Sequence, residues 1–413
     1  MKKEVVIVGG GIIGLCAAYY LLKEGHKVTV IDQSDISSGA SFVNAGFISP
    51  SHVTPLAAPG MVAMGFKMMF NSASPFYLKP RLDLDLMKWA WYFNKSATAK
   101  HVQEAAPVIK KFTLFSRELF EEMKSSKPFD FHLERKGLLM CYQTAKFEDK
   151  EARIAEVARK QGLEVEHLNK SKLKEMEPEM EAEGAFYYLD DAHSTPDDFM
   201  TIFYNYLKAE GVQFIINEKV LGFERNSTKI TNLITNKQQL KFDELVIASG
   251  SWSPVLAKKL GIKMLVQAGK GYRINVNRNT GIKYPAILTE LNTAVSPMDG
   301  FTRFGGTMEI AGINDTINQV RVKAIANAAQ TFYPNLTITK QEMQGAASGL
   351  RPVSPDGLPF IGRTKKYSNV CFATGHAMMG WSQGPATGKL ISEIISEKKP
   401  SINMKPFKIE RFG

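Results

Sequence analysis

The chain has 413 residues, of which 44% are hydrophobic and 23% are charged, a balance that excludes disordered and fibrous proteins. This length exceeds one ordinary hydrophobic core, so two domains are expected. The net charge of +11 is dispersed along the chain, which favours an anionic substrate or membrane surface over an RNA-binding or RNA-modifying protein with one concentrated basic face.

The first predicted element is an apolar, β-branched run at 4–8, typical of a buried parallel strand. A helix pattern follows from Ile12 to Lys23, Gly25 ends it, and residues 26–32 form a second strand. The basic, apolar start imitates a signal peptide, but glycines break the apolar run and the second strand follows at once. No run is apolar for the roughly 18 residues that span a bilayer, so the protein is expected in the cytoplasm.

Three glycines with the spacing G-x-G-x-x-G lie between this strand and this helix, and an acid closes the second strand. Together they predict a dinucleotide-binding site. Gly9 permits a tight turn, Gly11 lets the backbone approach a pyrophosphate, and Gly14 lets the helix pack closely on the strand. The helix start at Ile12 turns partial positive charge towards the phosphates, and Asp32 accepts hydrogen bonds from a ribose diol.

Residues 41–60, SFVNAGFISPSHVTPLAAPG, carry no helix or strand pattern. An NAD enzyme of this fold usually continues with further strand–helix repeats, whereas an FAD enzyme needs small residues where its backbone passes along the flavin. We therefore expect side-chain contacts to pyrophosphate or ribityl oxygens and backbone amide contacts to the ring. The residues concerned are Ser41, Asn44, Ala45, Gly46 and Phe47. The alternative is a surface loop.

The stretch 41–60 resembles the corresponding segment of bacterial D-amino-acid dehydrogenases. These belong to the FAD-dependent amine oxidoreductases, which include D-amino-acid oxidase, glycine oxidase and sarcosine oxidase. The similarity continues through 69–93, 242–254 and 270–276, and it is strongest at 349–395. Because these blocks lie at both ends and in the centre, most of the chain follows one template.

The resemblance implies further contacts to FAD. The backbone near Val220 faces adenine, and Gly250 and Trp252 crowd the pyrophosphate or adenine edge. A glycine-rich turn leads into a helix from about Pro385, whose positive end stabilises the anionic reduced flavin. The contacts expected in the last quarter of the chain are Gly349, Gly375, His376 and Gly380.

Covalent attachment of FAD and a metal site are both unexpected. Some relatives attach FAD through a cysteine, but Cys16, Cys141 and Cys371 do not lie where that attachment occurs. The three are too far apart for a metal motif or a disulfide pattern and indicate reduced, structural thiols. The sequence therefore predicts non-covalent FAD and no metal.

The expected fold class is α/β with α+β: a Rossmann-like FAD-binding domain and a second substrate domain built on a large antiparallel sheet. Helices are predicted at 104–123, 151–162, 194–211 and 320–333, and β-rich segments at 212–224 and 264–320. The helix at 194–211 carries a capping-box pattern, with Thr195, Pro196 and Asp198. The FAD-binding domain is expected to be discontinuous. Its predicted segments are 1–55, 148–263 and 341–413, and those of the substrate domain are 56–147 and 264–340.

The resemblance implies that a hydride passes from the α-carbon of a D-amino acid to flavin N5, and that the imine then hydrolyses to a 2-oxo acid. The substrate carboxylate needs a cation, and an arginine fork matches it in two places. The candidates are Arg351 in GLRPVSPDG and Arg303 in GFTRFGG; the alternative for each is a structural ion pair. Tyr272 is expected to bind the carboxylate or cap the pocket. His376 is expected to serve shape rather than to act as a base.

The resemblance also implies a quinone or another non-oxygen electron acceptor. Residues 60–93 combine methionine, phenylalanine and tryptophan with lysine, and they either cover the substrate domain or lie on the inner face of the cell membrane. Two alternatives stay open: an oxygen-using glycine, sarcosine or secondary-amine oxidase, and a D-proline or hydroxy-D-proline dehydrogenase. The sequence does not fix the preferred D-amino acid.

Overall fold

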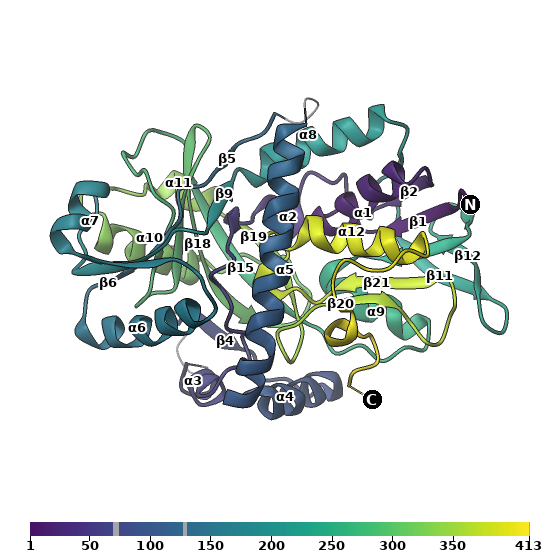
Figure 1. The fold of residues 1–413 in the computed structure, drawn as a ribbon, viewed down its shortest axis with the longest axis horizontal. Coiled ribbons are helices and arrows are strands. Elements are labelled where there is room, and N and C mark those ends of the chain that lie inside the picture. Colours follow the sequence, from purple (N-terminus) through teal and green to yellow (C-terminus); the bar gives the residue numbers. More distant parts are fainter. Residues whose placement is uncertain (69–73, 127–129, 413) are drawn as a thin grey trace.

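The computed structural model describes residues 1–68, 74–126 and 130–412. In this part of the chain a six-stranded sheet lies to the right in Figure 1 and a nine-stranded sheet to the left. The long helix α5 (Ala99–Ser125) crosses the front between them. The arrangement confirms the predicted fold class, a Rossmann-like part beside a second part built on a large, mostly antiparallel sheet.

The six-stranded sheet has the order β10-β2-β1-β14-β21-β20. Its neighbours run parallel apart from β20 and β21, which are antiparallel. The strands are β1 (Glu4–Val8), β2 (Lys27–Ile31), β10 (Gln213–Ile215), β14 (Glu244–Ile247), β20 (Phe360–Arg363) and β21 (Val370–Thr374). Every residue of β14 and β21 is buried, as expected for central strands with both faces covered.

Two helices pack against each other over this sheet at very short range. α1 (Ile12–Lys23) follows the glycine turn, and α12 (Gly384–Ile395) comes from the end of the chain. At Gly388 of α12, an added Cβ atom would overlap the backbone of Cys16 in α1. This contact brings the C-terminal segment beside the N-terminal dinucleotide turn (Figure 1).

The nine-stranded sheet has the order β19-β15-β18-β17-β16-β6-β8-β7, and β4 pairs with β18. The β16–β6 and β18–β4 pairs are parallel and the others antiparallel. The strands are β4 (Phe76–Leu78), β6 (Leu138–Tyr142), β7 (Val165–Asn169), β8 (Gly184–Tyr188), β15 (Gln267–Val276), β16 (Ala286–Leu288), β17 (Thr293–Met298), β18 (Phe301–Ile310) and β19 (Ala347–Val353). Helix α10 (Gln319–Phe332) packs its apolar side on this sheet.

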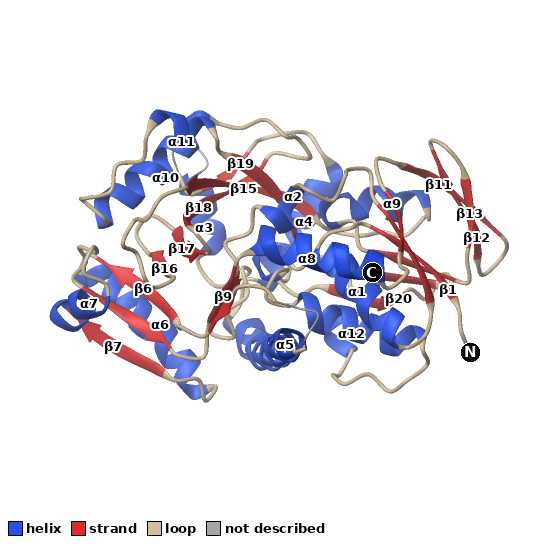
Figure 2. Cartoon of the chain, turned by 90° about the horizontal axis from the view of Figure 1, so that it is seen from above, coloured by secondary structure: helices blue, strands red, loops and turns tan. Residues whose placement is uncertain are grey.

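Two three-stranded sheets complete the described strands. One contains β3 (Phe47–Ile48), β5 (Leu133–Glu134) and β9 (Ala192–Ser194), in the order β3-β9-β5. The other contains β11 (Val220–Arg225), β12 (Ile230–Thr235) and β13 (Gln239–Lys241). Figure 2 shows this second small sheet at the opposite end of the molecule from β7.

The remaining helices connect these sheets. They are α2 (Gly39–Phe42), α3 (Met61–Met68), α4 (Leu84–Ser96), α6 (Ala145–Lys160), α7 (Lys170–Met176), α8 (Pro196–Ala209), α9 (Ser253–Lys259) and α11 (Lys340–Gln344). Short 3₁₀ turns lie at Gly250–Trp252, Ala377–Met379 and Lys405–Phe407. Within the described ranges, no helix combines the length and the apolar character needed to cross a bilayer.

The predicted helices are all present, with shifted ends. The capping box at the start of α8 is wrong, because the Thr195 side chain makes no hydrogen bond to the helix backbone. Its hydroxyl instead contacts His132 Nδ1 at 2.9 Å and accepts the backbone N–H of Asp299 at 2.9 Å. The segment 60–93 forms α3, β4 and the start of α4, although its residues 69–73 lie outside the described part.

The division into two domains stays a prediction, although several segments pair or pack with the part of the molecule to which they were not assigned. β7 and β8 belong to the nine-stranded sheet, and so does β19, although the predicted FAD-binding domain included all three. Conversely, α5 was assigned to the substrate domain, yet its residue Phe120 shares a core with Leu390 of α12. These long-range pairings cross the intervening helices, so the local sequence pattern did not reveal them.

Candidate functional site

A cavity of about 1050 Å³ opens between the two large sheets. It is large enough for a dinucleotide and a small substrate together, since typical small-molecule sites have roughly 300–1000 Å³. The predicted site residues that line it are Gly9, Gly11, Ile12, Asp32, Ser41, Asn44, Ala45, Phe47, Val220, Gly250, Trp252, Tyr272, Gly349, Arg351, His376 and Gly380. Most of the predicted residues therefore lie around one cavity, and their contacts to FAD and substrate stay predictions. Four predicted residues are not in the lining: Gly14, Gly46, Gly375 and Arg303.

The glycine turn after β1 has the geometry that a dinucleotide requires. Gly9 has a φ of +113°, and a Cβ atom there would lie 2.5 Å from the carbonyl oxygen of Ala248. A Cβ atom on Gly14 would overlap the carbonyl oxygen of Gly9. The turn can therefore pass close under a pyrophosphate only while these positions remain glycine.

The start of α1 and the end of β2 hold the polar groups of this turn. The Ser41 hydroxyl accepts the backbone N–H of Ile12 at 3.0 Å, which leaves its own proton for a phosphate oxygen. The Asp32 carboxylate accepts the N–H of Gly10 at 2.7 Å, the N–H of Ser34 at 2.8 Å and the hydroxyl of Ser34 at 2.7 Å. A carboxylate accepts about four hydrogen bonds, so Asp32 retains capacity for about one more, from a ribose hydroxyl.

The stretch predicted to follow the flavin forms helix α2 and the short strand β3. Gly46 has a φ of +77° and donates its N–H to Asn44 Oδ1 at 2.8 Å, and a Cβ atom on Gly46 would overlap the carbonyl oxygen of Ser194. The carbonyl of Ala45 accepts the Ser296 hydroxyl at 2.6 Å. Gly46 thus fixes the course of the loop through its contacts with Ser194 and Asn44. Ala45 and Phe47 line the cavity.

Arg303 is not in the cavity lining, and its contacts match the alternative, a structural ion pair, rather than a substrate clamp. It donates from Nη1 to the carbonyls of Phe42, at 3.0 Å, and Asn44, at 2.7 Å. It also donates from Nη2 to Asp197 Oδ2 at 3.1 Å and from Nε to Asn275 Oδ1 at 3.0 Å. These contacts use the guanidinium to fix the loop from α2 to β3 in place.

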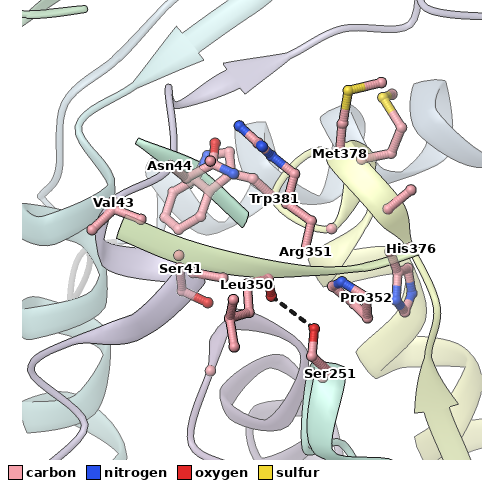
Figure 3. Close-up of a pocket in the computed structure, with 18 of the residues that line it drawn as sticks. Ser41, Val43, Asn44, Ser251, Leu350, Arg351, Pro352, His376, Met378 and Trp381 are labelled. Atoms are coloured by element: carbon pink, nitrogen blue, oxygen red, sulfur yellow. Dashed lines mark hydrogen bonds between the residues drawn. The ribbon is translucent and has the colours of Figure 1, made fainter. Parts of the chain in front are cut away.

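Arg351 lines the cavity as predicted. Figure 3 shows its side chain on one side of β19, pointing towards Asn44 and Trp381, while Leu350 lies on the other side. Its Nη1 donates to the carbonyl of Thr307 at 2.7 Å, and no described carboxylate lies within ion-pair distance. Burial lowers its pKa to about 10, so the guanidinium stays charged at neutral pH. The cavity therefore contains a cation without a counter-ion.

Two neighbouring residues, Thr307 and Gly271, have backbone features that accommodate the Arg351 guanidinium. Thr307 has a φ of 71°, which is unusual for a β-branched residue and turns its carbonyl towards the guanidinium. Gly271, on the neighbouring strand β15, leaves the space that the guanidinium fills, because a Cβ atom there would overlap Nη1, Nη2 and Cζ of Arg351.

Replacing Gly271 by alanine is therefore expected to displace the guanidinium while the backbone, which has no positive φ here, accepts the change. We expect KM for amino-acid substrates to rise roughly tenfold, equivalent to about 1.4 kcal/mol, with unchanged FAD content. Steady-state kinetics and the flavin absorbance of the purified variant measure both quantities. An unchanged KM would show that the position of Arg351 is not critical.

Tyr272 does not have a proton free for a substrate carboxylate. Its hydroxyl donates to Glu309 Oε2 at 2.8 Å, and Glu309 also pairs with Arg321 Nε at 3.0 Å. Burial and the hydrogen bond to Glu309 raise the pKa of Tyr272. The residue still lines the cavity, so it can cap the pocket, as the second part of that prediction states.

His376 is neutral and hydrogen-bonded to the start of α12, and its expected role in shaping the turn stays a prediction. Burial lowers its pKa to about 3. Its Nε2 lies 2.9 Å from the Thr387 hydroxyl, which donates its own proton to the carbonyl of Gln383 at 2.8 Å. We therefore assign the ring proton to Nε2. Helix α12 begins at Gly384, one residue before the predicted start.

Part of the cavity lining was not found from the sequence. It includes Ser51, His52, Met140, Lys150, Glu151 and Tyr188. Lys150 and Glu151 lie in α6, where their pattern is that of an ordinary amphipathic helix, so no local signal marked them. The cysteines lie elsewhere: Cys16, Cys141 and Cys371 are buried and not part of the lining.

Comparison with known proteins agrees with this site. The chain belongs to the FAD dependent oxidoreductase family (DAO), whose family model matches residues 4–394. FAD is thus its cofactor, and the glycine turn, Ser41 and Asp32 are the groups that fit the dinucleotide. The family resemblance inferred from the sequence is confirmed.

The chain is also similar to individual proteins of known name and to solved structures. The chain is 31% identical to a D-amino acid dehydrogenase of Helicobacter pylori, over 96% of both chains. It is 29% identical to a D-amino acid dehydrogenase of Granulibacter bethesdensis, over 99% of this chain and 100% of the relative. Among solved structures, glycine oxidase from Geobacillus kaustophilus aligns with a TM-score of 0.79 at 21% identity over 99% of each chain. L-proline dehydrogenase from P. horikoshii aligns with a TM-score of 0.76 at 20% identity, covering 100% of this chain and 98% of its own.

Proposed function

We propose that this FAD-dependent oxidoreductase converts D-amino acids to 2-oxo acids and ammonia, with a quinone or another non-oxygen molecule as final electron acceptor. The observation that carries the proposal is the charged, unpaired Arg351 in the cavity, which calls for a small anionic substrate. The names of the curated relatives support D-amino acids as the substrate class. FAD, when bound, supplies the two-electron acceptor for oxidation of the C–N bond.

The chain's own residues orient the substrate. Arg351 binds the carboxylate through the guanidinium N–H groups that the protein leaves free. The Thr307 carbonyl holds Nη1, and Gly271 leaves the space for the guanidinium. No side-chain base is required, because an amine that binds uncharged needs no proton removed before oxidation. His376 has a strongly lowered pKa and does not supply a proton at neutral pH.

A substrate and acceptor screen tests this function. We expect D-amino acids to be oxidised with a quinone or dye, with much slower formation of hydrogen peroxide in air, and L-enantiomers to be inactive. The panel includes glycine, sarcosine, D-proline and hydroxy-D-proline. Peroxide formed as fast as dye is reduced would identify an oxidase. Preference for D-proline or its hydroxy derivative would identify the imino-acid alternative.

We also propose that α4 and the residues before it contact the inner face of the cell membrane. Several large apolar side chains are exposed here, and the helical spacing places the last three on one side of α4. They are Leu82, Leu84, Met87 and Trp91. Lys95 lies on the same side, with its Nζ 5.2 Å from the centre of the Trp91 ring. Exposed apolar groups beside lysine match the surface of a bilayer with anionic lipids.

Vesicle binding checks this contact. We expect the protein to bind vesicles with anionic lipids at low salt and to dissociate as ionic strength rises. The double variant Met87→Ser/Trp91→Ser should lose most binding, while Val320→Ser, which removes an exposed apolar residue on α10, should not. Equal binding of both variants, or no binding of the wild type at low salt, would exclude α4 as a membrane contact.

A further inference from the structure

Outside the cavity, three potential metal-ligand side chains converge on the small sheet formed by β3, β9 and β5. His132 precedes β5, and Glu134 in β5 is the direct cross-strand partner of His193 in β9. Glu134 Oε2 lies 3.6 Å from His132 Nε2 and 3.6 Å from His193 Nε2. All three ligand atoms lie within 4.8 Å of one another.

His193 is a core histidine with weak polar contacts. Its side chain is fully buried, and neither ring nitrogen makes a well-formed hydrogen bond to the described residues, although the backbone of Pro297 lies close enough to interact with the ring. Buried polar groups nearly always have a partner, and an unmade bond destabilises the fold. The imidazole of histidine is the commonest metal ligand in proteins.

The other two side chains complete the arrangement. His132 Nδ1 lies 2.9 Å from the Thr195 hydroxyl, a contact that fixes the ring and directs Nε2 towards Glu134. Histidines that bind metals usually have such a partner on their second nitrogen. The side chains of His132 and Glu134 are 18% and 37% exposed, so an ion can reach the site from solvent.

We propose that His132, Glu134 and His193 bind one Zn²⁺ ion through His132 Nε2, a carboxylate oxygen of Glu134 and His193 Nε2. Two imidazoles and one carboxylate favour zinc over magnesium or calcium, which prefer oxygen ligands. In a tetrahedral zinc site with bonds of about 2.0–2.1 Å, neighbouring ligand atoms lie roughly 3.3 Å apart. Glu134 Oε2 lies 3.6 Å from each histidine Nε2, close to this spacing. The two histidine nitrogens lie within 4.8 Å of each other and move together when the ion binds, and water takes the fourth position.

One neighbouring charge limits the affinity. Lys136 Nζ lies 2.8 Å from Glu134 Oε2 and competes with a cation for that oxygen. Zinc must displace this ammonium group or use the other carboxylate oxygen. Removal of the charge by Lys136→Gln is consequently expected to strengthen zinc binding, whereas loss of a ligand weakens it.

The three side chains are connected to the loop that joins α2 to β3 and is predicted to follow the flavin. His193 pairs directly with Phe47 of β3. The next residue, Ser194, accepts the Trp381 Nε1–H at 2.9 Å through its hydroxyl, and its N–H donates to the Gly46 carbonyl at 2.9 Å. An ion that joins β9 to β5 therefore strengthens the support of the loop from Gly46 to Phe47. We expect zinc to raise the Tm of the FAD-loaded protein by a few degrees.

The test uses FAD-loaded protein freed of metals with a chelator and then titrated with ZnCl₂ by equilibrium dialysis and calorimetry. We expect one Zn²⁺ per chain, undisturbed by millimolar Mg²⁺, and at least tenfold weaker binding for His193→Gln. Lys136→Gln should bind severalfold more tightly. His167→Gln is the matched control, because His167 also faces a carboxylate, with Nε2 3.2 Å from Glu148 Oε1, and lies outside the proposed site.

Three results would overturn the proposal: no stoichiometric zinc, equal affinity for wild type and His193→Gln, or a loss of zinc in His167→Gln as large as in His193→Gln. If His193→Gln does not fold with FAD, His132→Gln replaces it, since His132 is less buried. Equal affinity for wild type and His132→Gln would then overturn the proposal. X-ray absorption of the zinc complex must also show nitrogen and oxygen ligands without sulfur.

Discussion

Replacing Arg351 by alanine is expected to lower kcat/KM for D-amino acids by roughly 30-fold to more than 1000-fold, while FAD stays bound. Removing one partner of a buried charge pair costs about 2–5 kcal/mol, and about 1.4 kcal/mol corresponds to a factor of ten. The effect should be large because Arg351 is charged, faces the cavity, and has no carboxylate of the protein to pair with. The fold should tolerate the change, because the guanidinium makes one hydrogen bond, to Thr307, in the described structure.

The control for this variant is Arg278→Ala, which removes an arginine that pairs with Glu342 and is not in the cavity lining. Its kinetics should match the wild type. Arg351→Lys should recover part of the lost activity, because lysine restores the charge but not the bidentate fork. Flavin absorbance separates loss of substrate binding from loss of FAD. If Arg351→Ala binds FAD and has wild-type kinetics, the hypothesis that Arg351 binds the substrate carboxylate is excluded.

The sequence predicted those parts of the site that depend on local geometry. The glycine turn, Asp32 and the 41–60 stretch follow one another along the chain, and each has a conformational requirement that small or acidic residues meet. Gly9 needs a positive φ, and Gly46 needs contact with the Ser194 backbone. Such local requirements restrict which residue types can occupy these positions, so they can be recognised in the sequence.

The distinction between the two arginines could not be predicted in this way. Arg303 and Arg351 both lie in strands of the same large sheet, in segments rich in glycine. Their roles depend on what lies opposite: the carbonyls of Phe42 and Asn44 surround Arg303, while Arg351 faces open space. That difference arises from tertiary packing of segments far apart in the sequence.

The His132–Glu134–His193 cluster was missed for a similar reason. Metal motifs are recognised by short, fixed spacings, but here β5 and β9 meet only through strand pairing across a long intervening segment. The placement of β7 and β8 in the nine-stranded sheet has the same origin, because β8 pairs with β6 across helix α6. Non-local pairing therefore accounts for the main differences between the predicted and the observed arrangement.

Replacing Gly14 by alanine is expected to abolish stable FAD binding and to lower the Tm. The added methyl group would overlap the carbonyl oxygen of Gly9, which is backbone and cannot move aside like a flexible side chain. Either α1 shifts away from β1 or the Gly9 turn distorts, and both move the helix N-terminus that faces the pyrophosphate. Overpacking of this kind costs about 1–3 kcal/mol.

Gly222→Ala is the matched control for this change, because a Cβ atom at Gly222 meets no other atom within 4 Å and the residue has no positive φ. The control should be yellow, contain one FAD per chain that acid or heat releases, and unfold at the wild-type Tm. Gly14→Ala should be colourless, or lose its flavin on gel filtration, because the loss of one close contact misplaces the whole pyrophosphate site. Full FAD occupancy and an unchanged Tm in Gly14→Ala would show that the turn adapts without loss, and the fit of helix to strand would then not explain how this chain binds its cofactor.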